Sequence, residues 1–251
     1  MTIALIIPNW PAPANLVAYT TTRQGGVSQG AYHSLNLSTA VGDEPDAVWE
    51  NRRLVQQLRP LPGDWIFPNQ VHGTRCLILD GQSPTDITAD AAYSRTPGSI
   101  CSILTADCLP LLVCTKAGDE IAAIHAGWRG LAAGVIEASL AHFHSEPTQL
   151  LVWLGPAIGP QAFIVEEPVR RRFIAQQPSA AIAFSALGKA NYHANLYQLA
   201  RLRLQAIGVP NQQIYGGDYC TWSDSTRFFS YRRDETTGRM VSVIAMESKI
   251  A

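Results

Sequence analysis

The chain has 251 residues and a formal net charge of −1 at pH 7, with 47% hydrophobic and 16% charged residues. A chain so close to neutral lacks the strongly basic surface that binds nucleic acid or anionic membranes, so we expect neither partner. Its length and low charge content predict one globular, enzyme-like domain spanning residues 1–251.

The cysteines and the N-terminal segment predict a cytoplasmic location. There are five cysteines, an odd number, and no two of them form a C-x-x-C pair. The opening MTIALIIPNW lacks basic residues, and its apolar run is too short for a membrane helix. We therefore expect reduced thiols in a cytoplasmic protein.

Hydrophobic periodicity predicts strands and helices in mixed order along the chain. The expected strands are Ile3–Ile7, Val17–Thr22, Arg75–Leu79, Asp90–Tyr93, Ser99–Leu104, Leu109–Thr115, Glu120–Ala126, Leu150–Leu154, Phe163–Val165 and part of Arg227–Met240. The expected helices are Asp46–Leu58, Trp128–His144, Pro168–Gln176 and Ala194–Gly208. This order predicts a mixed α/β fold, in which central mixed β-sheets are flanked by helices.

A hairpin formed by the Leu109–Thr115 and Glu120–Ala126 strands is the central feature of the sequence. A Gly-Asp pair in a short loop between two apolar runs is typical of such a turn. Pairing Thr115 with Glu120 places His125 opposite Pro110, and pairing Ala117 with Glu120 places it opposite Leu112. In both registers His125 shares a face with Cys108, because strand side chains alternate.

The open end of this hairpin is the first candidate for a chemical site. With Thr115 opposite Glu120, Cys108 and His125 are diagonal neighbours with backbones about 7–8 Å apart. A metal ion or a Cys–His hydrogen bond can span that separation. Adding His72, from Asn-Gln-Val-His-Gly, gives two imidazoles and a thiolate, which are good zinc ligands.

Two other interpretations of these residues stay open at this point. Cys108 is a candidate nucleophile with His125 as its base, oriented by Asp107 or another group. The third interpretation is purely structural, a buried thiol beside a histidine. The sequence spacing alone does not choose among them.

Arginines in glycine-rich or aromatic settings are candidates for binding phosphate. Arg23 precedes two glycines, Arg129 follows His125 in His-Ala-Gly-Trp-Arg-Gly, and Arg232 and Arg233 follow two aromatic residues and Ser-Tyr. Arg129 is the strongest of them, because it lies at a strand-to-helix turn.

Eight sequence blocks together resemble the YfiH family, also called the laccase-domain or polyphenol-oxidase-like family. They are TTRQGGVS, SLNL, GDEPDAVWENRR, NQVHGT, TADCLPLL, AAIHAGWRG, WLGPAIGP and FFSYRRDETTGRM, and the resemblance extends from about residue 5 to residue 245. The family's metal ligands fall on His72, Cys108 and His125. The family fold is similar to a CNF-type bacterial toxin domain with a catalytic Cys–His pair.

The resemblance implies a metal-dependent purine nucleoside phosphorylase. Its substrates would be adenosine, inosine or methylthioadenosine together with phosphate, and adenosine deamination would be a side activity. For this activity we expect Cys108, His125 and Arg129 to be catalytic, and Arg23, Arg129 and Arg233 are the candidate phosphate-binding residues. The purine would lie against aromatic residues and the Gly155–Gly159 loop.

The family resemblance also implies two alternatives: a copper-dependent polyphenol oxidase, and a Cys-nucleophile amidase that edits peptidoglycan precursors. The chain's six histidines are too few for a multicopper cluster. They suit a single metal, for which imidazole and thiolate ligands favour zinc and also accept copper. The oligomeric state is not predicted.

Overall fold

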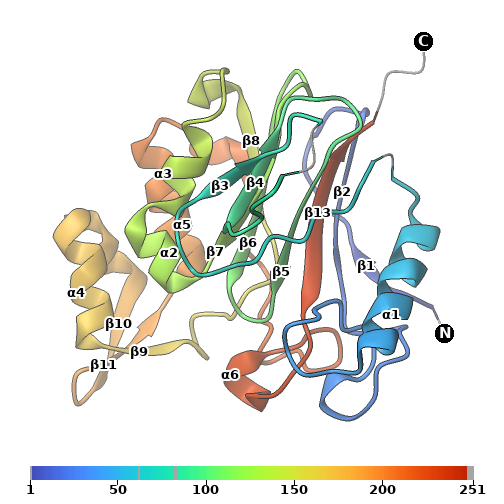
Figure 1. Ribbon diagram of the computed structural model, residues 1–251. Helices are drawn as coiled ribbons and strands as arrows, with labels where there is room; N and C mark the ends of the chain where they lie inside the picture. Colours follow the sequence, from blue (N-terminus) through green and yellow to red (C-terminus); the bar gives the residue numbers. More distant parts are fainter. Residues whose placement is uncertain (1, 62, 82–83, 248–251) are drawn as a thin grey trace.

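The computed structural model describes residues 2–61, 63–81 and 84–247, which form stacked layers of sheets and helices (Figure 1). A six-stranded sheet lies at the centre, in the order β12-β8-β6-β7-β4-β3. Its strands are β3 (Cys76–Ile78), β4 (Ala91–Ser94), β6 (Leu109–Thr115), β7 (Ile121–Ala126), β8 (Leu150–Leu154) and β12 (Ile214–Gly216). The β3–β4 and β8–β12 pairs are parallel and the others antiparallel, so the sheet is mixed.

An antiparallel four-stranded sheet packs against one face of the central sheet, in the order β1-β2-β13-β5. Its strands are β1 (Leu5–Ile6), β2 (Leu16–Thr21), β5 (Ile100–Thr105) and β13 (Met240–Met246). The core between the sheets includes Leu112 and Ile121 from β6 and β7, and Ile103 and Ile244 from the second sheet. Helix α1 (Pro45–Leu58) covers the outer face of that second sheet.

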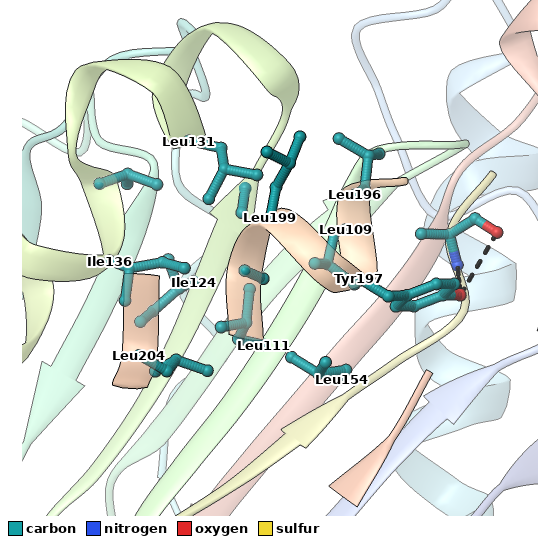
Figure 2. Close-up of a cluster of buried hydrophobic side chains, with 14 of the residues drawn as sticks. Leu109, Leu111, Ile124, Leu131, Ile136, Leu154, Leu196, Tyr197, Leu199 and Leu204 are labelled. Carbon is teal, nitrogen blue, oxygen red and sulfur yellow. Dashed lines mark hydrogen bonds between the residues drawn. The ribbon is translucent and has the colours of Figure 1, made fainter. Parts of the chain in front are cut away.

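Three helices cover the opposite face of the central sheet, as Figure 2 shows: α2 (Trp128–Ala133), α3 (Val135–Leu140) and α5 (Leu196–Ala206). Leu109, Leu111 and Ile124 of the hairpin pack there against helix residues such as Leu131 and Leu199. The hairpin is therefore buried on both faces, which explains its nearly continuous apolar sequence.

Smaller elements complete the described chain. A three-stranded sheet is formed by β9 (Ile164–Glu166), β10 (Phe184–Gly188) and β11 (Asn191–Ala194), beside α4 (Glu167–Gln176). A short helix, α6 (Tyr231–Asp234), precedes β13. Four 3-10 turns lie at Gly30–Tyr32, Pro147–Gln149, Pro178–Ala183 and Asn211–Gln213. Within the described ranges, no helix combines the length and apolarity needed to cross a membrane.

The predicted hairpin register is confirmed. The Thr115 N–H donates to the Glu120 carbonyl at 3.1 Å, and Pro110 lies opposite His125. The mixed α/β class with central sheets and flanking helices is also correct. The strand prediction for Leu150–Leu154 matches β8, and the Asp46–Leu58 helix differs from α1 only at its first residue.

Two element predictions are wrong and three strands were missed. The single helix expected at Trp128–His144 ends at Ala133, because Gly134 has a φ of +97° and separates α2 from α3. Arg227–Met240 contains the α6 helix, with its N-cap at Ser230, and the strand only begins at Met240. Strands β10, β11 and β12 are too short or too polar to be recognised from an alternation of apolar and polar residues.

Because the hairpin is buried on both faces, truncating its side chains should strongly lower the free energy of unfolding. Leu111 is 0% exposed, and Leu111→Ala should lower the free energy of unfolding by ~2–5 kcal/mol through lost burial and a cavity. Urea denaturation measures this change. Leu187→Ala, at a 50% exposed position of β10, is the control and should cost less than about 0.5 kcal/mol. Equal effects of the two substitutions would contradict this description of the core.

Candidate functional site

The site is organised by Asp90, a fully buried carboxylate just before β4. Its oxygens accept hydrogen bonds from the backbone N–H groups of Val71, His72 and Gly73, at 3.2, 2.8 and 2.6 Å. The carboxylate also contacts Nδ1 of His125 at 2.8 Å, and the Asp90 carbonyl accepts the His125 backbone N–H at 2.7 Å. One residue thus holds both the His72 loop and the end of β7.

Three potential metal ligands meet above this carboxylate. The ligand atoms of His72, Cys108 and His125 lie within 4.8 Å of one another. Nε2 of His72 is 3.7 Å from Sγ of Cys108, and the two imidazole ring centres are 4.8 Å apart. An ionised Asp90 can only accept hydrogen bonds, so it keeps a proton on Nδ1 of His125. Nε2 is therefore the ring nitrogen that would bind a metal ion.

Glycine at two positions of the His-Ala-Gly-Trp-Arg-Gly motif allows this close approach. A Cβ added at Gly127 would lie 2.8 Å from the His72 ring and 2.9 Å from Sγ of Cys108. One added at Gly130 would lie 2.8 Å from the Gly73 carbonyl oxygen. The β7–α2 turn can therefore pack against the His72 loop only without side chains at these positions.

The donor set fits a metal ion, and in the metal-free protein it forms a thiolate–imidazolium pair whose His125 Nε2 proton a bound metal would displace. Burial alone would raise the pKa of the Cys108 thiol, but His125 and His72 outweigh it and lower this pKa to about 6. Burial would lower the pKa of His125, but Cys108 and Asp90 raise it to about 9. Burial also opposes ionisation of Asp90, yet hydrogen bonds from His125 and Gly73 keep its pKa below the ordinary value. A thiolate with two imidazoles is a three-ligand set that leaves a coordination position open for water or substrate.

The cluster opens into a cavity of about 540 Å³, a volume typical of small-molecule sites. Aromatic side chains in its wall are Trp128, Phe163 and Tyr231, and Ile158 and Leu196 add apolar surface. Three arginines also line it, Arg129, Arg232 and Arg239. The arrangement can hold a flat apolar group and an anion beside a metal site.

Some of the arginines predicted to bind phosphate line the cavity, and others lie in loops outside its lining. Arg129 lines the cavity, with its guanidinium 4.6 Å from the Trp128 ring centre. Arg23 lies outside the lining, where it donates to the carbonyls of His33 and Ser225. Arg233 also lies outside it, bonded to the carbonyls of Thr221, Trp222 and Phe228. Of the expected purine-binding loop, Gly155–Gly159, only Ile158 lines the cavity.

Sequence reasoning missed two residues of the site. The group that orients His125 is Asp90, whereas the named candidate Asp107 bonds to Thr221 and Arg232 instead. No pattern distinguished Asp90 from an ordinary acidic residue before a strand. Arg239 was also missed, although it belongs to the quoted block FFSYRRDETTGRM. Burial lowers the pKa of Arg239, and the neighbouring charges of Cys108 and Asp107 oppose that effect.

Comparisons with known proteins agree with the resemblance seen in the sequence blocks. Residues 17–247 match the family model described as "Multi-copper polyphenol oxidoreductase laccase". The chain is 51% identical over 240 residues to "Purine nucleoside phosphorylase YfiH" of Escherichia coli (strain K12), covering 96% of this chain and 98% of that protein. It is 47% identical to the "Purine nucleoside phosphorylase" of Haemophilus influenzae, over 96% of this chain and 99% of that one.

Solved structures show the same fold. The Neisseria meningitidis protein NMB0706 superposes with a TM-score of 0.90 at 46% identity, over 97% of this chain and 99% of that chain. YlmD from Geobacillus stearothermophilus has a TM-score of 0.90 at 30% identity, over 97% and 96% of the two chains.

The role of Asp90 predicts a specific loss of metal affinity. Asp90→Asn removes the charge that holds His125 and the His72 loop, so the affinity for zinc should fall about 10–100-fold. Competition with a chromophoric chelator measures it. Asp86→Asn, at an exposed carboxylate bound to Arg75, is the matched control and should leave the affinity unchanged. An unaltered affinity in Asp90→Asn would contradict the assignment.

The pKa of Cys108 predicts its reactivity in the metal-free protein. The thiolate forms as pH rises through about 6, and His125 keeps its proton up to about pH 9, so the ion pair persists between these values. Alkylation by iodoacetamide, followed at the Cys108 peptide by mass spectrometry, should reach half its plateau rate near pH 6. Buried Cys114, whose pKa is raised to about 12, should stay unreactive. A midpoint near the ordinary thiol value of about 8.5 would refute the ion pair.

Proposed function

The chain belongs to the family described as multi-copper polyphenol oxidoreductase laccase, and we propose that it is a metal-dependent purine nucleoside phosphorylase. The names of its close relatives support this activity. The substrates we propose are adenosine, inosine and methylthioadenosine, each cleaved at the N-glycosidic bond with phosphate. Adenosine deamination is a second proposed activity of the same site.

The observation that carries this proposal is the meeting of the His72–Cys108–His125 cluster and three arginines in one cavity. Phosphorolysis requires a bound phosphate beside the ribose, and guanidinium groups are suited to that anion. We assign phosphate binding to Arg129, together with Arg232 and Arg239. Since Arg23 and Arg233 are bonded to backbone carbonyls outside the cavity, we assign them to loop structure.

We propose zinc as the metal, held by His72, Cys108 and His125. The donor set also accepts copper, but only two of the six histidines belong to the cluster, so the site suits one ion rather than a multicopper centre. When bound, the metal supplies Lewis acidity toward phosphate or water.

The protein's own residues would bind and orient the two substrates. The aromatic and apolar wall, including Phe163 and Ile158, suits a purine ring, and the arginines place a phosphate oxygen against C1′ of the ribose. In the reaction a C1′–O bond forms as the bond from C1′ to the purine nitrogen breaks. The purine takes up a proton and leaves as the free base, and the sugar leaves as its 1-phosphate: ribose 1-phosphate from adenosine or inosine, and 5-methylthioribose 1-phosphate from methylthioadenosine.

A Cys-nucleophile amidase is the second candidate, and the lowered pKa of Cys108 beside His125 favours it. The two candidates respond differently to metal removal. A chelator should abolish phosphorolysis, whereas a nucleophilic cysteine should stay active without metal and be lost on alkylation.

We also propose a cytoplasmic location and a single catalytic domain over residues 1–251. All five cysteines are free thiols, as expected in a reducing compartment.

The proposed activity is tested with zinc-loaded protein and adenosine or inosine, with and without phosphate. Chromatography should detect free base and ribose 1-phosphate only when phosphate is present, and neither with Cys108→Ala. Arg129→Ala should raise the KM for phosphate about tenfold or more, through loss of a charged hydrogen bond. Arg53→Ala, at an exposed arginine paired with Glu50, is the control and should leave the KM unchanged. Absence of base release from every nucleoside, or release without phosphate, would reject the phosphorylase.

A further inference from the structure

Asp107 directly precedes Cys108 but plays no part in the Asp90–His125 interaction. It is 8% exposed, and its φ of +90° lies in the left-handed region, where non-glycine residues are strained. We infer that Asp107 is a positioning residue that fixes one wall of the cavity, and with it Arg232, against the segment that carries Cys108, just before β6. Its role as a substrate-positioning residue rests on the proposed function.

Three separate segments are joined at Asp107. The Thr221 hydroxyl donates to Oδ1 at 2.6 Å, and the backbone N–H of Arg232 donates to Oδ2 at 2.6 Å. The Asp107 carbonyl accepts the N–H of Ile158 at 3.0 Å. Thr221 also links its own segment to that of Ile158, because its N–H donates to the Ala157 carbonyl at 3.0 Å. Both carboxylate oxygens are therefore used in connecting loops, as a buried carboxylate requires.

These contacts determine where the positive charge of Arg232 lies. Arg232 belongs to α6, whose backbone is held by Asp107, and its guanidinium donates to the Ile164 carbonyl at 2.9 Å. The same guanidinium lies 5.2 Å from the Phe163 ring centre. Tyr231, which also lines the cavity, precedes Arg232 in α6, whereas Ile158 is held by the backbone carbonyl of Asp107. The α6 part of this wall therefore depends on a carboxylate other than Asp90.

The part of the lining that contains Gln70, His72 and Leu104 is held by other contacts. The Gln70 side chain bonds both to the N–H and to the carbonyl of Leu104, at 2.8 Å each. His72 is held by Asp90, as described above. Loss of the Asp107 carboxylate should consequently release the Arg232 wall and leave the metal ligands in place.

The test compares Asp107→Ala with Asp107→Asn in the metal-loaded, full-length protein. Asn is the conservative variant: its amide oxygen can accept the Arg232 N–H, and its NH₂ can donate to the Thr221 hydroxyl, which accepts as well as donates. Asp107→Ala should raise the KM for phosphate about tenfold with a smaller change in kcat, and Asp107→Asn should restore it to within about twofold. Asp46→Ala, the same change at an exposed position of α1, is the control.

Two further measurements do not depend on turnover. Hydrogen exchange of residues 220–233 should be faster in Asp107→Ala than in the wild type and Asp107→Asn. The thiolate-to-cobalt absorption of the cobalt-substituted protein should be the same in all of them, because the metal ligands are unaffected.

The inference is overturned if Asp107→Ala leaves both the phosphate KM and the exchange unchanged, if it alters the cobalt spectrum, or if Asp107→Asn fails to restore the wild-type values. If the wild type releases no base with phosphate, the phosphorylase proposal fails separately. Hydrogen exchange, together with calorimetric binding of inorganic phosphate to the variants, then still decides the role of Asp107.

Discussion

The site depends on one buried ionic interaction, that between Asp90 and His125. The carboxylate accepts hydrogen bonds from Nδ1–H of the imidazole and from three successive backbone N–H groups of the His72 loop, and the Asp90 carbonyl accepts one from the His125 backbone N–H. A buried carboxylate is costly unless every such partner is present. Because Asp90 directly precedes β4 and His125 lies on the neighbouring strand β7, formation of the central sheet brings the partners together.

Asp90 and Asp107 hold different parts of the cavity lining in place. Asp90 fixes the His72 loop and His125, and Asp107 connects the Arg232 wall to the segment that carries Cys108, just before β6. Both act on loops at the ends of strands whose own positions are set by apolar cores on each side of the central sheet. This separation places the loops that carry the site residues on a double-sided scaffold, a common arrangement in enzymes.

Much of the scaffold and the cluster of potential metal ligands were predictable from sequence, and the rest was not, for physical reasons. Strand alternation and the length of the hairpin loop were enough to place Cys108 and His125 on one face. His72 required the family resemblance, because its position depends on a loop held by long-range hydrogen bonds. Asp90 and Arg239 were missed because burial and tertiary partners, rather than local pattern, give them their roles. The break at Gly134 reflects a left-handed backbone that helical periodicity does not reveal.

The central claim is that the chain binds one metal ion through two imidazoles and one thiolate. X-ray absorption spectroscopy at the zinc edge of the zinc-loaded protein tests it most directly. The structure predicts one zinc per chain, with a single sulfur at about 2.3 Å and two imidazole nitrogens at about 2.0–2.1 Å. The sulfur contribution should disappear in Cys108→Ser. A zinc shell without sulfur, or with sulfur that persists in that variant, would contradict the account.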